Sequence, residues 1–124
     1  MEKFEGLPTD FRKWVNYELR QIENLKIKPA IMLLKTEDES VPELLWGMDY
    51  DNSEFEGETI DYVAMHEDKI GLYFQNGKGK IRNIKDKVIY ELNRRRGSDV
   101  EFEKVGFASY EKGDSIESIL KRAY

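Results

Sequence analysis

Apolar residues recur at three- and four-residue intervals across residues 10–26 and predict one amphipathic helix. The members of this stripe are Phe11, Trp14, Val15, Leu19, Ile22 and Leu25. Lys28-Pro29 ends the pattern, because proline lacks the amide hydrogen that a helix interior requires. The continuous apolar run at 30–34 then predicts a strand that is buried on both faces.

Apolar residues in the segment at 36–61 follow neither the helical nor the strand period throughout. Residues 41–48 fit either a short helix or a strand. The acidic stretch at 49–61 is interrupted by Gly57 and predicts a loop. This part of the chain is therefore the least defined by its pattern.

The second half of the chain returns to clear periods. Two apolar runs, 60–66 and 69–75, flank a tight charged corner and predict a β-hairpin. Spaced apolar residues over 81–95 predict another helix, with Gly97 as its stop signal. Residues 100–110 are rich in Val and Phe and predict a further strand.

A last helix follows the turn at 112–115. Asp114 and Glu117 have the spacing of a capping box. The residues expected to face the core from this helix are Ile116, Ile119 and Leu120. Helices that alternate with strands in this way predict an α+β fold, an α/β sandwich with one mixed sheet flanked by helices.

Composition is typical of one globular domain over residues 1–124. The chain is 40% hydrophobic and has a formal net charge of −5, which argues against general nucleic-acid binding. It has no cysteine and one histidine, so disulfides, thiolate metal sites and His-rich sites are excluded. No window approaches 18 apolar residues, so we expect no membrane insertion and a cytoplasmic location. The abrupt start and end suggest a domain excised from a longer protein.

Charge is segregated along the chain. Residues 35–61 contain ten acidic residues and one basic residue, whereas residues 66–96 contain nine basic and four acidic residues. Two solvated faces explain this pattern. The alternative is a pair of complementary surfaces that help the domain find a protein partner or another copy of itself.

The corner His66-Glu67-Asp68-Lys69 lacks the glycine that sharp turns favour. Glu67 and Asp68 are adjacent carboxylates, but magnesium binding or acid–base work would require another carboxylate aimed at the same point. The end of the first strand, Lys35-Thr36, supplies none, and Asp38 lies beyond it.

Two other groups of residues are candidates for function. Arg94, Arg95 and Arg96 could contact a phosphate or a partner, although a basic helix end is also what the helix macrodipole favours. Trp14 and Trp46 could form binding platforms, but we expect both in the core.

Three stretches, in order, resemble the GGDEF domain of diguanylate cyclases. The opening GLPTDF at 6–11 is similar to the family's GLPNRRxF and precedes a helix, a proline and an apolar strand. The hairpin at 60–75 carries His66-Glu67-Asp68-Lys69-Ile70 in the place of Gly-Gly-Asp-Glu-Phe. The ending, VGFASY followed by GDS and LKRA within 105–123, is similar to the family's SIGVA, GDS and LLKRAD.

The resemblance implies a nucleotidyl cyclase-like fold that is shortened in the middle, and the departures from it imply lost activity. Lys69 replaces the family's catalytic and metal-binding glutamate. The metal-binding aspartate after the first strand falls at Lys35 or Thr36, and the substrate-binding segment is not recognisable before Asp61. Only Asp68 is retained from the signature, so no catalytic residue, metal site or cofactor is expected.

The leading hypothesis is a non-catalytic GGDEF-like signalling domain from a bacterial cyclic di-GMP pathway. It would act as a protein-interaction, dimerisation or regulatory module. The alternative is a nucleotide-binding sensor or weak hydrolase for GTP, ATP or cyclic di-GMP, with Asp68, Glu67 and Asp38 as residual contacts. A further alternative is an acidic inhibitor or decoy protein that uses residues 37–61.

Overall fold

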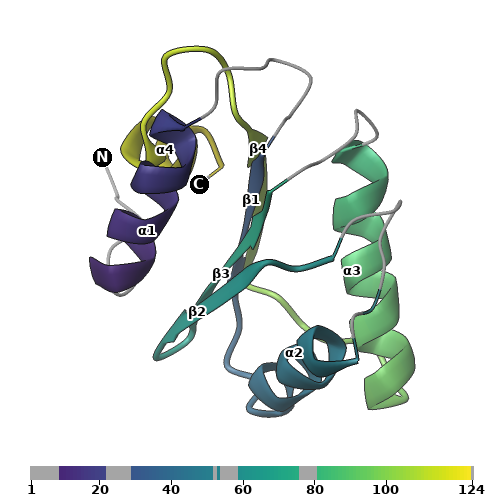
Figure 1. Ribbon diagram of the computed structural model, residues 1–124. Coiled ribbons are helices and arrows are strands. Elements are labelled where there is room, and N and C mark those ends of the chain that lie inside the picture. The colour runs from purple at the N-terminus through teal and green to yellow at the C-terminus, as the bar shows by residue number, and fades with distance from the viewer. Residues whose placement is uncertain (1–8, 22–28, 52, 54–58, 76–80, 124) are drawn as a thin grey trace.

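The computed structural model (Figure 1) describes residues 9–21, 29–51, 53, 59–75 and 81–123. Within these ranges the chain forms four helices and four strands. In order they are α1 (Thr9–Arg20), β1 (Ala30–Lys35), α2 (Ser40–Tyr50), β2 (Tyr62–His66), β3 (Lys69–Phe74), α3 (Ile81–Arg96), β4 (Lys104–Ser109) and α4 (Ile116–Ala123). No helix in this part of the chain is both long and apolar enough to cross a membrane.

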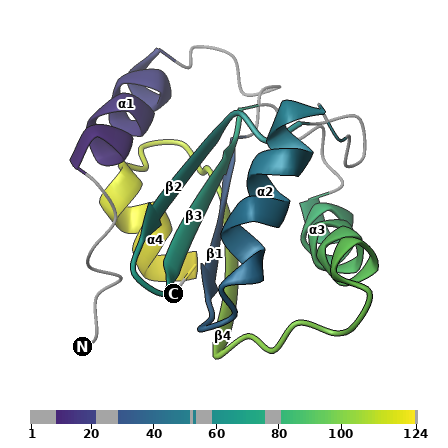
Figure 2. The same cartoon turned by 90° about the horizontal axis from the view of Figure 1, so that it is seen from below.

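The four strands form one sheet in the order β2-β3-β1-β4. All three neighbouring pairs are antiparallel. The path β1-α2-β2-β3-α3-β4 is the split β-α-β arrangement, also called ferredoxin-like. Figure 2 shows α1 and α4 on one side of this sheet and α2 and α3 on the other, so the fold has three layers.

The central strand β1 supplies residues to both cores. Ala30, Met32 and Leu34 pack toward α2 and α3, whereas Ile31 and Leu33 pack toward α1 and α4. This alternation follows from the two-residue period of a strand. The predicted strand buried on both faces is therefore confirmed.

The α2/α3 layer forms the larger core. Both helices place apolar residues at intervals of three or four, which aligns them along one side of each helix. The buried members are Val41, Leu45 and Met48 on α2 and Ile84, Val88 and Leu92 on α3. Residues 41–48, which the pattern left open between helix and strand, are thus helical because this stripe faces the sheet, and α2 runs on to Tyr50, into the start of the predicted loop.

The α1/α4 layer packs around aromatic side chains. Phe11, at the start of α1, is fully buried, and its ring lies 5.4 Å from that of Tyr62. Trp14 stacks on Tyr62 at 5.1 Å and meets Tyr73 edge-on at 5.3 Å. Such pairs contribute about 0.5–1.5 kcal/mol each beyond their burial, and they attach α1 to the β2/β3 side of the sheet.

The mixed α+β class and the helices on both faces are as predicted, but the sheet is antiparallel rather than mixed. The reason is that each helical connection skips one strand. β1 and β2 run parallel, as do β3 and β4, yet neither pair is adjacent in the sheet.

Two helix ends also differ from expectation. α1 ends at Arg20, and residues 22–26 of the predicted helix lie outside the described residues. At α4 the reciprocal capping contacts join Ser115 and Ser118, each backbone amide donating to the other's hydroxyl at 3.0 and 3.3 Å. The predicted pairing of Asp114 with Glu117 was wrong because the Asp114 carboxylate is used by Arg122.

Candidate functional site at the hairpin end of the sheet

A row of basic side chains crosses the sheet at the end where β1 stops. Lys35 lies opposite Lys69 on β3 and opposite Lys104 on β4, and His66 on β2 lies opposite Lys69. Residues directly opposite each other point to the same face, and like charges in such pairs are destabilising. Lys35 Nζ is 3.3 Å from a Glu103 carboxylate oxygen, which offsets part of this repulsion.

Sequence reasoning identified Lys35, Lys69 and His66 but missed Lys104. It did not place the first three in one row, because that depends on strand register. Register depends on how the strands pair, and the local sequence around Lys104 does not predict that pairing. We call the three lysines Lys35, Lys69 and Lys104, together with His66, the lysine row.

The residue after the lysine row, Thr36, is a structural centre. It is 4% exposed, and its amide donates to the backbone oxygen of Asp68 at 2.9 Å. Its hydroxyl donates to the Glu101 carbonyl at 2.7 Å and accepts from the Asp38 amide at 3.1 Å. Thr36 thus ties together the hairpin tip, the approach to β4 and the start of α2.

The hairpin tip is a two-residue turn, because His66 pairs with Lys69. Glu67 has a φ of 56°, whereas Asp68 is not among the residues with positive φ. A positive φ at this position of the turn favours glycine. The chain therefore holds a side chain in a conformation that strains L-residues by about 1–2 kcal/mol.

A pocket of about 370 Å³ opens between the hairpin tip and the start of α2. Its lining includes Asp38, Glu67 and Asp68, so the structure brings the three predicted residual contacts to one place. Contact with a nucleotide or metal stays a prediction. Among the described residues, no group of three or more His, Asp or Glu side chains is arranged to hold a metal ion.

The Asp38 carboxylate is already engaged within the chain. One oxygen accepts from the Ser40 amide at 3.0 Å and the Ser40 hydroxyl at 2.6 Å, and the other lies 2.7 Å from Arg96 Nε. The Ser40 hydrogen bonds, followed by Arg96, lower the pKa of Asp38. This carboxylate therefore anchors α2 to the end of α3.

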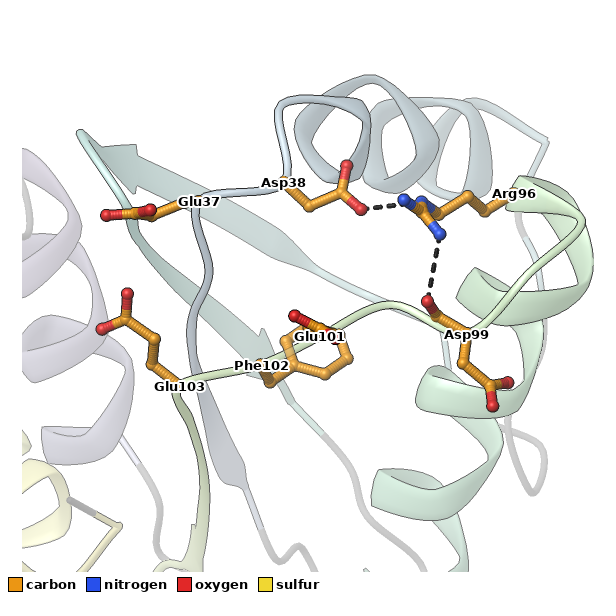
Figure 3. Close-up of a pocket in the computed structure, with 7 residues that line it drawn as sticks. All are labelled: Glu37, Asp38, Arg96, Asp99, Glu101, Phe102 and Glu103. Carbon is orange, nitrogen blue, oxygen red and sulfur yellow. Dashed lines mark hydrogen bonds and ion pairs between the residues drawn. The ribbon is translucent and has the colours of Figure 1, made fainter.

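A larger pocket of about 700 Å³ adjoins the first and shares Glu37 and Asp38 with it (Figure 3). Five carboxylates and a single arginine supply its charged lining. The lining residues are Glu37, Asp38, Arg96, Asp99, Glu101, Phe102 and Glu103. Because a cavity lined by one sign of charge repels ligands of that sign, both pockets disfavour a bare polyanion.

The three arginines proposed as phosphate or partner contacts all have partners within the chain. Arg94 forms a two-pronged pair with Glu91, and Arg95 binds Glu91 at 2.9 Å and Asp51 at 2.5 Å. Arg96 binds Asp38 and donates to the Asp99 carbonyl at 3.0 Å. Their role as phosphate or partner contacts stays a prediction. Arg95 and Arg96 bind the end of α3 to neighbouring segments, whereas Arg94 pairs within the helix.

Comparisons with protein-family models, with curated proteins and with solved structures found no match to this chain.

Proposed function

We propose that this chain is a non-catalytic signalling domain with a GGDEF-like scaffold, acting as a protein-interaction, dimerisation or regulatory module. The observation that carries the proposal is the lysine row. Lys69 stands where the resemblance calls for a metal-binding glutamate, the metal-binding aspartate falls at Lys35 or Thr36, and the register sets Lys35 opposite Lys69.

The lysine row opposes binding of magnesium at this end of the sheet. Two-metal phosphoryl transfer requires carboxylates to hold the ions and neutralise developing charge. Here Lys35 and Lys69 would repel a divalent cation, and Thr36 is occupied in three backbone contacts. The residues at Lys35, Thr36 and Lys69 do not fit the magnesium ion that the resemblance implies there.

Two features support descent from a GGDEF-like scaffold. β1 and β3 are sheet neighbours, so the hairpin tip lies beside the end of the first strand. The positive φ falls at Glu67, where the resemblance places the second glycine of Gly-Gly-Asp-Glu-Phe. A side chain has replaced glycine there while the turn has kept a glycine-type conformation.

The alternative of a nucleotide-binding sensor has one observation in its favour, the smaller pocket that gathers Asp38, Glu67 and Asp68. The acidic lining of both pockets opposes it, because a triphosphate would enter a field of its own sign. The interaction role is therefore preferred.

Titration calorimetry with GTP, ATP and cyclic di-GMP, each with Mg²⁺, tests the proposal. We expect no saturable heat at micromolar ligand and no cyclic di-GMP after incubation with GTP. Binding at micromolar ligand that is lost in Asp68→Ala would overturn it.

A gain-of-charge variant sharpens this test. Lys35→Asp with Lys69→Glu replaces two positive charges beside Asp68 with carboxylates and leaves the Thr36 contacts in place. We expect Mg²⁺ to bind this variant more tightly than the parent chain, but we expect no cyclase activity. Cyclic di-GMP from the variant would show that a substrate-binding segment persists.

A further inference from the structure

The side of α2 that faces away from the sheet is acidic and aromatic. Its residues stand at positions i, i+4, i+7 and i+11 and are all exposed, namely Glu39, Glu43, Trp46 and Tyr50. Residues at this spacing share one side of a helix. Glu39 is the N-cap, and its φ of −68° and ψ of −13° extend the helical path to the start of the row. We call these four residues the α2 ridge.

The two aromatic members of the α2 ridge lie outside the core. Trp46 is 62% exposed and Tyr50 is 91% exposed. The expectation that Trp46 belongs to the core was wrong, because the buried stripe of α2 occupies the side of the helix that faces the sheet. Trp and Tyr are among the residue types that contribute most to binding energy at interfaces.

The negative charge of α2 exceeds what the helix itself requires. No basic residue occurs between Thr36 and Asp61, the stretch that contains α2. The helix macrodipole favours acidic residues in the first turn, which accounts for Glu43. Asp49 lies in the last turn, where the macrodipole favours cations, and no basic residue accompanies it there. Stabilisation of the helix therefore does not explain its acidic character.

Two arginines of α3 approach α2, and both are engaged at its ends. Arg96 pairs with Asp38 just before the helix, and Arg95 pairs with Asp51 just after it. Figure 1 shows the reason, since α2 crosses the C-terminal end of α3. Among the described residues, neither carboxylate of the α2 ridge has an ion-pair partner, so both can accept hydrogen bonds from another molecule.

The α2 ridge meets the pocket of about 370 Å³ at its Glu39 end, because Glu39 also lines that pocket. The other carboxylates of the lining are Glu37, Asp38, Glu67 and Asp68. A cavity lined by one sign of charge attracts ligands of the opposite sign. The lining that opposes a triphosphate thus favours a cationic side chain, which can enter the pocket from a segment lying on the ridge.

We propose that the α2 ridge and this pocket together bind an arginine-rich segment of a partner protein. One arginine stacks on the Trp46 ring and donates hydrogen bonds to Glu43, which is its neighbour at the i, i+3 spacing. A second arginine enters the pocket beside Glu39, and Tyr50 extends the aromatic surface at the other end. This inference rests on the proposed interaction role and specifies the chemistry of the partner.

Arginine fits these groups better than lysine does. The planar guanidinium stacks on aromatic rings and presents a fork of N–H donors to a carboxylate, whereas the lysine ammonium is a strongly hydrated point charge. Attraction between net charges alone would not distinguish the two side chains. A preference for arginine therefore reports on the Trp46 ring and its neighbouring carboxylate.

Fluorescence anisotropy of labelled peptides with the whole chain tests the proposal. The probe is a peptide of about ten residues in which arginine alternates with serine, because in extended form it spans the ridge of about 16 Å. Matched probes carry lysine or glutamate in place of arginine. At about 0.1 M NaCl we expect saturable binding of the arginine peptide, binding of the lysine peptide that is weaker by about threefold or more, and no binding of the glutamate peptide.

An aromatic variant locates the contact on α2. Trp46→Ala should weaken binding of the arginine peptide about tenfold and remove its advantage over the lysine peptide. The control is Tyr17→Ala, because Tyr17 is also 62% exposed but lies on α1, on the other side of the sheet (Figure 2). This control should bind the peptide as the parent chain does.

A charge variant separates the ridge from the net charge of the chain. Glu39→Gln with Glu43→Gln should weaken binding of the arginine peptide about fivefold or more. Glu111→Gln with Glu117→Gln removes the same charge from exposed positions at the β4–α4 corner and should change binding by less than about twofold. Circular dichroism on every variant confirms that these exposed substitutions leave the fold intact.

The proposal fails if the arginine peptide does not bind, if the arginine and lysine peptides bind equally, or if the control variants weaken binding as much as the ridge variants do. It also fails if sedimentation velocity shows self-association that Trp46→Ala abolishes, because a second copy would then occupy the ridge. A chain that binds neither peptide nor nucleotide would reject this inference and leave the proposed function standing. A chain that binds both the arginine peptide and GTP would do the reverse.

Discussion

The β4–α4 corner and the β2–β3 corner both carry carboxylates, but only the first uses one to hold its structure. The Asp114 carboxylate accepts hydrogen bonds from the Glu111 amide at 2.8 Å and the Ser118 hydroxyl at 2.9 Å. Arg122 donates a hydrogen bond to each of its two oxygens. At the β2–β3 corner the anchor is the neutral hydroxyl and amide of Thr36. The carboxylates at the hairpin tip are therefore not required by the fold, whereas Asp114 is.

The two corners should differ in their response to pH. The hydrogen bonds from Arg122 are the main reason why the pKa of Asp114 falls to about 2. The Thr36 contacts involve no group that titrates. As pH falls, the β4–α4 corner should therefore lose its contacts before the β2–β3 corner does.

The largest effect is expected from Thr36→Val, which removes the hydroxyl but keeps the shape of the side chain. The Glu101 carbonyl and the Asp38 amide both lose their partner, and we expect the free energy of unfolding to fall by about 2 kcal/mol. Urea denaturation measures the change.

Thr36→Ser is the matched control, because it keeps the hydroxyl and loses only a methyl group. It should be clearly more stable than Thr36→Val. If the valine variant unfolds at the parental urea concentration, the hydroxyl is not the anchor of the hairpin corner.

Asp114→Asn should have the next largest effect. With solvent screening of its partly exposed partner taken into account, we expect a loss of about 1 kcal/mol at pH 7. The folded pKa is depressed, so this stability is present above the unfolded value near 3.9 and is lost as pH falls toward 2. Thermal melts across pH 2–7 should accordingly show a shallower acid transition in the variant.

Glu117→Gln provides the comparison for Asp114. Glu117 pairs with Arg12 at 3.6 Å, but its side chain is 62% exposed, so its loss should change stability by less than about 0.5 kcal/mol. Equal effects of the two substitutions would remove the distinction between a structural and a surface carboxylate.

The sequence predicted those parts of the fold that depend on the local spacing of apolar residues. β1, the hairpin and α3 all appear within a few residues of expectation, because apolar spacing reports directly on which side is buried. Residues 41–48 were ambiguous, since Val41, Leu45 and Met48 fit a helix only once a sheet is present to receive them.

The site was harder to predict because it is assembled from distant segments. The lysine row needs the register of four strands, and the role of Thr36 needs Glu101, which lies 65 residues away. Such contacts have no local signature in the chain. By contrast, the gathering of Asp38, Glu67 and Asp68 could be anticipated, because a hairpin beside the first strand brings its tip to that strand's end.

The smallest effect is expected at the hairpin tip, where adjacent positions should respond with opposite signs. Glu67 has positive φ, so Glu67→Gly removes strain and should raise stability by about 0.5–1 kcal/mol, net of the entropy that glycine adds to the unfolded chain. Asp68 lacks positive φ, so Asp68→Gly gains only that entropy and should lower stability by a similar amount. Urea denaturation of the two variants decides the matter. Changes of the same sign would mean that the turn does not hold the strained conformation, and the parallel with a glycine-bearing signature would lose its structural basis.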